Sequence, residues 1–324
     1  MNIYAAAVDY ISDLPVLKAW PDTKSLLERA ASKQPRHWRL PVVACEAAGG
    51  SAEQAVPASA ALACAQIGII LIDDMLDEDP RGEYHRIGEA QAANFAAAFM
   101  SAGLEAISQS AARPETKLAA MKSLNQMILT TAFGQYLDCQ NPADENAYWC
   151  VVESKSAPFF GSAFHLGALF GGASNDAAEK VERIGRLYGG MIQIHDDMND
   201  CMATPAGPDW IQGRCPLPIL FAQTVDHPQR SRFLELRQHV SDVNALLEAQ
   251  EILIRCGAVS YCVDQLLRRQ RAAQAVLAGA PLIRREVIEP VLNELVTPVY
   301  RLFEAMGNPP LDRATFLAES ETRE

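Results

Sequence analysis

The sequence has few features of β-structure, and its cysteines follow no metal-binding or disulfide pattern. Asn-Gly and Asp-Gly hairpin turns are absent, and alternating β-branched or aromatic runs are scarce. The eight cysteines form no Cys-x-x-Cys pair or Cys/His ligand spacing, and a chain of 324 residues can bury a core without disulfide support. These absences exclude zinc-finger and disulfide-stapled classes and indicate reduced thiols in a cytoplasmic protein.

Positive charge and membrane-targeting features are scarce as well. Lys and Arg total 28 against 40 Asp and Glu, which gives a net charge of −12, so no nucleic-acid partner is expected. The N-terminus lacks a basic region followed by an apolar signal segment. The longest apolar run, residues 58–72, is interrupted by Gln66 and ends at Asp73, short of membrane-spanning length. We therefore expect a soluble protein with no membrane span.

Helix-forming residues dominate the chain, and no linker or composition shift divides it. With 49% hydrophobic and 21% charged residues, it can bury one large core. We predict a single all-α domain over residues 1–324. The predicted helices cover residues 2–11, 22–32, 38–49, 57–77, 85–111, 114–138, 144–154, 156–171, 177–200, 216–224, 229–238, 240–255, 260–277 and 283–305.

Two segments, residues 73–77 and 196–200, repeat the spacing Asp-Asp-x-x-Asp after an apolar run. On a helix these three positions lie on adjoining or stacked parts of one face, so each segment concentrates carboxylates in a small volume. Carboxylates this close stay ionised together only when a cation neutralises them. Their hard oxygen ligands favour Mg²⁺, with Mn²⁺ as an alternative. The predicted ligands are Asp73, Asp74, Asp77, Asp196, Asp197 and Asp200.

Two metal-binding walls that face each other across a helical bundle would hold a diphosphate from both sides. The metal would neutralise the charge that develops when diphosphate leaves carbon. Lys155, at the start of a predicted helix, and Arg214, in the Pro-rich loop after the second cluster, are placed to complete this site. An apolar surrounding would shield the resulting carbocation from water. The residue pattern therefore predicts cleavage of an allylic diphosphate.

Five segments of the chain resemble motifs of the trans-isoprenyl diphosphate synthase (polyprenyl synthetase) family of the class I terpenoid fold. They occur along the chain in the same order as in the family. Residues 72–79 resemble its first aspartate-rich motif and residues 189–200 its second. Residues 134–138 resemble the Gly-Gln-x-x-Asp segment between them, and residues 155–156 stand where the family has Lys-Thr. Residues 209–218 resemble Asp-x-x-x-Gly-Lys-x-Thr-x-Pro, with Arg in place of Lys. Together these matches are specific, whereas one Asp-Asp-x-x-Asp segment alone is weak.

The resemblance implies a helical bundle around a deep apolar cavity, usually in a homodimer, with Mg²⁺ linking both aspartate clusters to an allylic isoprenyl diphosphate. Lys155 and Arg214 would hold the diphosphate beside Ser156. Gln193 would direct a dipole at the carbocation. Isopentenyl diphosphate or another acceptor would then attack that cation.

The site for a second diphosphate departs from the family pattern. The family's Gly-Gly-Lys-Arg-x-Arg-Pro corresponds to residues 34–40, in which Arg36 replaces Lys, His37 replaces the first Arg and Arg39 is retained. Gln66 stands where a His is typical, and Arg81 remains from an Arg-Arg-Gly segment. Because a neutral amide and a His cannot replace fixed positive charges, we expect weakened affinity for isopentenyl diphosphate.

Four functions remain open at this point. The first is prenyl transfer to isopentenyl diphosphate or another acceptor. The second is a terpene cyclase of the same ancestry, in which the cation reacts with its own double bonds. A non-catalytic subunit is disfavoured because both aspartate clusters are intact. Acidic helix caps without catalytic function are also disfavoured, because carboxylates near a helix C-terminus oppose the helix dipole.

Overall fold

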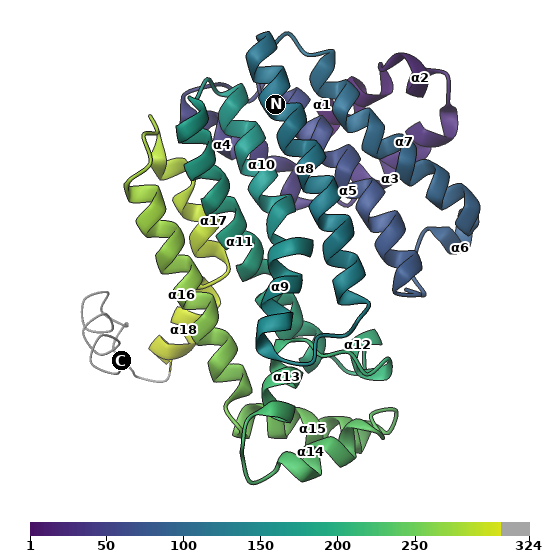
Figure 1. Cartoon of the computed structure of the whole chain (residues 1–324), viewed down its shortest axis with the longest axis vertical. Coiled ribbons are helices and arrows are strands. Elements are labelled where there is room, and N and C mark those ends of the chain that lie inside the picture. The colour runs from purple at the N-terminus through teal and green to yellow at the C-terminus, as the bar shows by residue number, and fades with distance from the viewer. Residues whose placement is uncertain (306–324) are drawn as a thin grey trace.

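The computed structural model describes residues 1–305 as a bundle of α-helices and two 3-10 helices, with no strand in that range (Figure 1). The prediction of an all-α fold is confirmed. The helices are α1 (Ile3–Ser12), α2 (Pro15–Lys18), α3 (Pro21–Ser32), η1 (Arg36–Arg39), α4 (Leu40–Ala48), α5 (Val56–Leu76), α6 (Tyr84–Ile87), α7 (Glu89–Ser108), α8 (Pro114–Asp138), α9 (Glu145–Lys155), α10 (Ala157–Phe170), α11 (Asn175–Met202), α12 (Pro208–Ile211), α13 (Leu217–Thr224), α14 (Arg230–Arg237), α15 (Val243–Arg255), α16 (Ala258–Ala278), η2 (Arg285–Val287), α17 (Glu289–Glu294) and α18 (Thr297–Ala305).

Three predicted helices are divided in the structure, and two short ones, α2 and α12, were not predicted. Residues 38–49 split into η1 and α4, because Pro41 lies in the first turn of a new helix. Residues 85–111 are interrupted at Gly88, whose φ of 85° is incompatible with a continuous helix. Residues 283–305 form η2, α17 and α18, and a proline again lies at the start of each α-helix.

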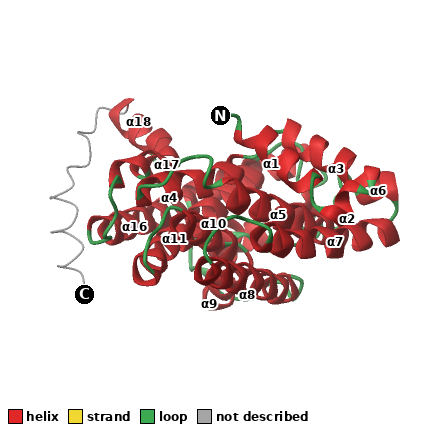
Figure 2. Ribbon diagram, turned by 90° about the horizontal axis from the view of Figure 1, so that it is seen from above, coloured by secondary structure: helices red, strands yellow, loops and turns green. Residues whose placement is uncertain are grey.

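The core of the bundle depends on close approach between neighbouring helices. Seen from above, α10 lies in the middle, with α4, α11 and α5 around it (Figure 2). A Cβ added at Gly185 of α11 would lie 2.4 Å from the carbonyl oxygen of Phe160, and one added at Gly103 of α7 would lie 2.9 Å from that of Ala61. Glycine at these positions lets α11 pack directly on α10, and α7 directly on α5.

Helix α5 meets the length and composition of a membrane span, which the sequence analysis did not expect. The helix has 21 residues and is long and apolar enough to cross a membrane by these two criteria alone. No other helix among the described residues meets both criteria. Most of the helix is buried, and it packs against α7, α1 and α8. This is the environment of a core helix, and it fixes the position of the aspartates at its C-terminal end.

The C-terminal ends of α5 and α8 and the helix α9 meet α11 towards one end of the bundle, next to α12 and α13 (Figure 1). Beyond this end, α12 to α15 form a lobe with its own buried cluster, which includes Trp210, Phe233 and Leu246. The loop between α11 and α13 therefore lies between two packed units. It carries Asp209 and Arg214 to the aspartate clusters.

Candidate active site

One aspartate from each cluster lines a pocket of about 130 Å³, and the other four aspartates do not line it. Asp77 from the end of α5 and Asp197 from α11 both line it. Lys155 from α9 and Arg214 from the loop after α12 line the same pocket. Elements far apart in the sequence thus bring carboxylates and cations into one small space.

Cations from other elements contact the first cluster. The Nζ of Lys155 lies 2.9 Å from Asp73 Oδ1, and the Nη2 of Arg214 lies 2.6 Å from Asp77 Oδ1. The amide of Gln135 also donates to Asp73 Oδ1, at 3.1 Å. Gln212 donates to the backbone carbonyl of Asp77 at 2.8 Å. The loop that carries Arg214 is therefore attached to the end of α5 by two bonds.

Neutral donors hold the central residue of the second cluster. Asp197 is buried and accepts hydrogen bonds from the Tyr148 hydroxyl and the Leu217 backbone N–H, both at 2.8 Å, and from the Gln193 amide at 2.7 Å. The hydroxyl of Ser156 donates in turn to Gln193 at 2.5 Å. A continuous set of hydrogen bonds therefore links α9, α11 and the start of α13.

Asp196 and Asp200 differ from Asp197 in their surroundings. Both are exposed, and they share one face because positions i and i+4 of a helix are stacked. The charge of Asp200 contributes to raising the pKa of Arg81, in the loop after the first cluster, although the hydrogen bond of Arg81 to Asp79 is the main cause.

Two carboxylates of the aspartate clusters, Asp74 and Asp197, hold their protons more tightly than an ordinary aspartate. Burial raises the pKa of Asp74 to about 6, with further contributions from the charges of Asp79 and Asp73. Burial likewise raises the pKa of Asp197 to about 7, against the lowering effect of its three donors. For Lys155, burial lowers the pKa, but the charges of Asp73 and Asp138 outweigh it and raise the pKa overall.

The donor set suits a hard divalent cation that is shared with a phosphate ligand. Among the described residues, no three Asp, Glu, His or Cys side chains form a ready-made metal cage. Mg²⁺ seldom requires one, because it keeps several waters and binds through one or two carboxylates together with phosphate oxygens. The pKa of Asp74 is raised mainly by burial and further by the charges of Asp79 and Asp73, and a bound cation would oppose both effects.

Sequence reasoning did not assign site roles to three residues that the structure places here. Asp138 lies 2.6 Å from the Nζ of Lys155 and 3.9 Å from the Nη1 of Arg214, so it faces both cations. Tyr148 binds Asp197, and Asp209 lines the same pocket. Asp138 and Asp209 belong to segments that resemble family motifs, which was an available signal. Nothing in the sequence distinguishes Tyr148 from an ordinary core tyrosine.

The residues predicted to bind a second diphosphate lie on separate elements. Arg36 forms an ion pair with Glu294 at 2.5 Å, and Arg81 forms one with Asp79 at 2.8 Å. Gln66 accepts a hydrogen bond from the Trp38 indole at 2.7 Å. Arg36 and Arg39 both line a hollow of about 550 Å³ between η1, α4 and α17. The structure thus brings Arg36 and Arg39 together, whereas Arg81 lies in the loop after the first aspartate cluster.

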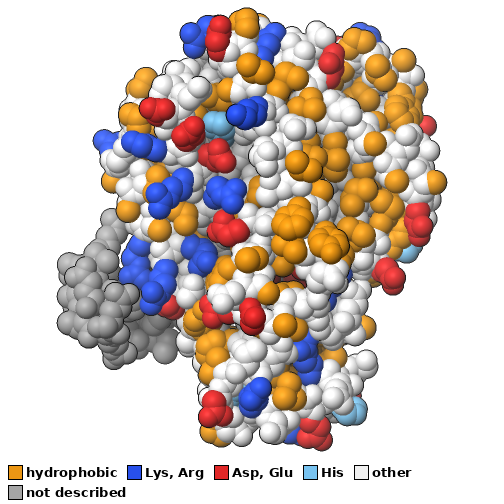
Figure 3. Space-filling model, in the orientation of Figure 1, with side chains coloured by type: hydrophobic (Ala, Val, Ile, Leu, Met, Phe, Trp, Pro, Cys, Tyr) orange, Lys and Arg blue, Asp and Glu red, His pale blue; other side chains and the backbone are white. Residues whose placement is uncertain are grey.

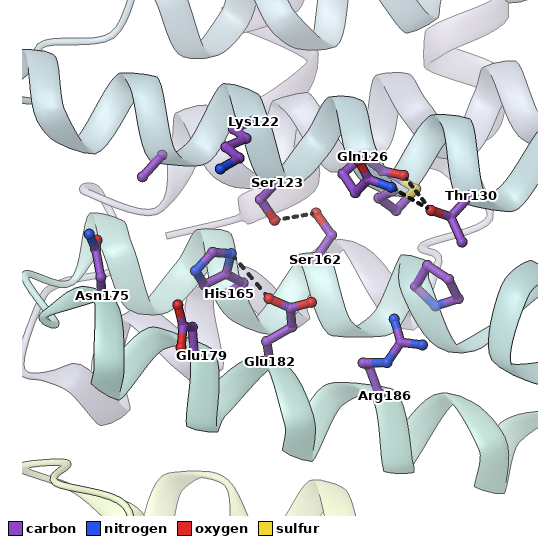
Figure 4. A pocket seen from close by; sticks show the side chains of 13 residues that line it. Lys122, Ser123, Gln126, Thr130, Ser162, His165, Asn175, Glu179, Glu182 and Arg186 are labelled. Carbon is purple, nitrogen blue, oxygen red and sulfur yellow. Dashed lines mark hydrogen bonds and ion pairs between the residues drawn. The ribbon is translucent and has the colours of Figure 1, made fainter.

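A larger groove of about 300 Å³ crosses α8, α10 and α11 (Figure 4). His165 in this groove lies 3.5 Å from Glu182, and Lys122 and Arg186 lie at its sides. No residue of either aspartate cluster lines it. The charges in this groove are mixed in sign.

The fold and the site define an all-helical protein in which two aspartate-rich helices face a shared pocket completed by cations. The polyprenyl synthetase family model matches residues 27–253, and the chain belongs to this family.

Individual relatives are similar at moderate identity. The chain is 29% identical over 196 residues to a geranylgeranyl diphosphate synthase of Methanosarcina mazei, a match that covers 56% of this chain and 60% of that enzyme. It is 27% identical to a short chain isoprenyl diphosphate synthase of Methanothermobacter thermautotrophicus, covering 72% of this chain and 77% of the other. The solved polyprenyl synthase of Caulobacter crescentus, complexed with calcium and isoprenyl diphosphate, superimposes with a TM-score of 0.75 at 22% identity, covering 91% and 93%. This structural likeness supports the same helical fold.

Proposed function

We propose that this chain is a Mg²⁺-dependent prenyltransferase that ionises an allylic isoprenyl diphosphate and transfers the prenyl cation to isopentenyl diphosphate or another acceptor. The proposal depends on the meeting of Asp77 and Asp197, one from each aspartate cluster, with Lys155 and Arg214 in one pocket. Family membership and the names of the relatives support it. Mn²⁺ is the alternative ion.

The residues of the proposed site have different roles when the diphosphate leaves. Asp73, Asp74, Asp77, Asp196 and Asp200 are the proposed metal ligands, and Asp197 is either a ligand or the residue that fixes α11 against α13. When bound, the metal supplies neutralisation of the negative charge that grows on the leaving oxygen. Lys155 and Arg214 donate hydrogen bonds to the diphosphate beside Ser156, and charge-assisted bonds of this kind are strong.

Bond breaking and bond making then balance without an added oxidant or reductant. The carbon–oxygen bond of the donor breaks, and its electron pair leaves with the diphosphate. The double bond of the acceptor supplies the pair for the new carbon–carbon bond, and a proton is lost from the coupled cation. Gln193 places its carboxamide dipole at the pocket, where it can stabilise positive charge.

The experiment that tests the proposal measures pyrophosphate and organic products together. The protein is incubated with Mg²⁺ and geranyl, farnesyl or geranylgeranyl diphosphate, with and without isopentenyl diphosphate. A longer prenyl alcohol after phosphatase treatment is expected only when both substrates are present. A cyclic hydrocarbon or alcohol formed without isopentenyl diphosphate would identify a cyclase instead. Absence of pyrophosphate release from every donor would overturn the proposal.

We also propose a homodimer that forms through α8, in a cytoplasmic protein. Leu118, Leu129, Phe133 and Tyr136 of this helix are large hydrophobic residues that are more than half exposed. Figure 3 shows hydrophobic side chains gathered over α8 and α7 on this face. A contiguous apolar surface of this kind is typical of a protein interface. A monomeric mass by light scattering at micromolar concentration would contradict the dimer.

A further inference from the structure

The loop between α12 and α13 carries Arg214 into the pocket that one aspartate of each cluster lines. Gly213, just before it, has a φ of 71°, a left-handed conformation that favours glycine. The N–H of Arg214 donates to the carbonyl of Asp209 at 2.8 Å. Among the described residues, the carbonyls of Gly213 and Arg214 accept hydrogen bonds only from side chains, those of Asn141 and Arg237. The position of Arg214 therefore depends on these two side chains.

The guanidinium of Arg237, in α14, binds two consecutive carbonyls of this loop. Its Nη2 donates to the carbonyl of Gly213 at 2.7 Å and also to the carbonyl of Arg214. Its Nη1 donates to Gln223 Oε1 in α13. The Gln223 amide donates in turn to Cys215 Sγ at 3.1 Å. Because a planar guanidinium presents its donors in a fixed geometry, these bonds hold the backbone of the loop in one position.

The lobe that α12 to α15 form fixes the position of Arg237. Phe233 and Leu236 of the same helix are buried in the core of this lobe. Arg237 follows Leu236 directly, and successive side chains on a helix point about 100° apart. Arg237 is accordingly half-buried at the edge of the lobe, and it does not line the pocket. Its contact with the site is through the loop.

The opposite side of the loop is attached to the first aspartate cluster. Gln212 donates to the backbone carbonyl of Asp77 at 2.8 Å, and its Oε1 accepts from the Nε of Arg214 at 2.9 Å. The Nη2 of Arg214 donates to Asp77 Oδ1 at 2.6 Å. A diphosphate that accepts from this Nη2 replaces the pair with Asp77. The bonds of Arg237 are to the backbone of the loop, so they are kept when the ligand binds.

We propose that Arg237 is a positioning residue for the diphosphate, because it holds the backbone of Gly213 and Arg214 so that the Arg214 guanidinium stays directed at the pocket. This inference rests on the proposed function. It gives α14, no residue of which lines the pocket, a role in binding the ligand. Arg237 lies 23 residues after Arg214, outside every segment that resembles a family motif.

A double-mutant cycle with Arg214 measures this role. The probe is pyrophosphate at saturating Mg²⁺, and isothermal titration gives its dissociation constant. In Arg237→Gln the dissociation constant should rise about fivefold, because the Arg214 guanidinium is no longer held in its binding orientation. In the Arg214→Gln background the same substitution should change it less than about twofold, because no guanidinium is left to position. A purely structural role would give the same factor in both backgrounds.

Arg232→Gln is the matched control, because Arg232 is an arginine of the same helix that pairs with Glu235 and Glu248. It should leave the dissociation constant unchanged. Arg237→Lys retains the charge but not the planar array of donors, so it should weaken pyrophosphate binding as Arg237→Gln does. Without ligand, hydrogen exchange in the peptide that spans residues 209–216 should be faster in both Arg237 variants than in the wild type or the control.

Equal losses of affinity from Arg237→Gln in the wild-type and Arg214→Gln backgrounds would overturn the inference. Wild-type affinity in Arg237→Lys would overturn it as well, since charge alone would then explain the effect. Wild-type affinity in Arg237→Gln, with pyrophosphate bound normally by the wild type, would overturn the inference alone. A wild-type protein that binds no pyrophosphate with Mg²⁺ would overturn the proposed function together with the inference.

Discussion

The first aspartate cluster, on α5, is neutralised by cations from other elements, whereas the second, on α11, is organised by neutral donors. Lys155 and Arg214 pair with Asp73 and Asp77. Asp197, in contrast, is the one buried residue among the six aspartates, and its partners are a hydroxyl, a backbone N–H and an amide. The same motif therefore forms ion pairs with cations on α5 and hydrogen bonds with neutral donors on α11.

Helix geometry explains the difference within each cluster. Positions i and i+4 are stacked, but position i+1 is rotated by about 100°. Asp73 and Asp77 accordingly face the two cations, while Asp197, at the i+1 position, turns into the contact between α9, α11 and α13. Asp196 and Asp200 are exposed, and neither lines the pocket. We infer that binding of the metal falls mainly on the i and i+4 positions.

The largest expected effect distinguishes Asp200 from Asp197. Asp200→Ala should lower the rate of pyrophosphate release about a thousandfold without changing stability, because the side chain is exposed. Asp197→Ala should lower the free energy of unfolding by about 3 kcal/mol as well as activity, because three donors lose their acceptor. Urea unfolding and a pyrophosphate assay on both variants measure the difference. Equal stability of the two variants would refute the division of roles.

A smaller effect is expected at Arg214, which pairs with Asp77 at 2.6 Å. In Arg214→Gln, affinity for pyrophosphate in the presence of Mg²⁺ should fall between ten- and a hundredfold, because a charge-assisted contact is lost. Affinity for Mg²⁺ alone should rise a fewfold, because the metal no longer competes with the guanidinium for Asp77.

Isothermal titration with Mg²⁺, and then with pyrophosphate at saturating Mg²⁺, separates these two affinities. Arg232→Gln is the control, since Arg232 forms a similar pair with Glu248 at 2.7 Å on the exposed lobe. It should change neither affinity. A fall in both affinities in Arg214→Gln would show that Arg214 does not compete with the metal.

Helix positions were predictable where the sequence contains clear boundaries. Pro114 starts α8, no proline or unfavourable run interrupts it, and the predicted range of 114–138 matches the structure. The break at Gly88 was missed because a single glycine is tolerated in many helices, and only its φ of 85° shows that this one ends α6. Short helices such as α12 are stabilised by tertiary packing, so local sequence patterns do not predict them.

The site was predictable to the extent that its residues repeat a spacing. The aspartates, Lys155 and Arg214 were identified by motifs and charge, and the structure brings Asp77, Asp197 and the two cations to one pocket. The bond between Trp38 and Gln66 joins residues 28 apart on different helices, and Tyr148 contacts Asp197 across 49 residues. Such pairs follow from the packing of η1 and α9 against the core helices, which sequence periodicity does not specify.

The smallest expected effect concerns the pH dependence of stability at Asp74, the i+1 residue of the first cluster. Its pKa in the folded protein is raised to about 6, whereas an aspartate in the unfolded chain titrates near pH ~3.9. The folded state therefore binds this proton more tightly. Its contribution to stability is present below pH ~4 and is lost as the pH rises through about 6.

Asp74→Asn removes this titration and resembles the protonated carboxyl. Between pH 4 and 7 the wild type should lose on the order of 1 kcal/mol of unfolding free energy relative to the variant. The pKa of Asp197 is also raised. Because Asp197 is present in both proteins, its contribution to the pH dependence of stability cancels in the comparison. Urea midpoints across this range, measured with EDTA present, give the difference directly. Parallel pH profiles would show that Asp74 is solvated like an ordinary surface aspartate. Asp74 and Asp197, the two i+1 residues, would then share their place in the motif but not a raised pKa.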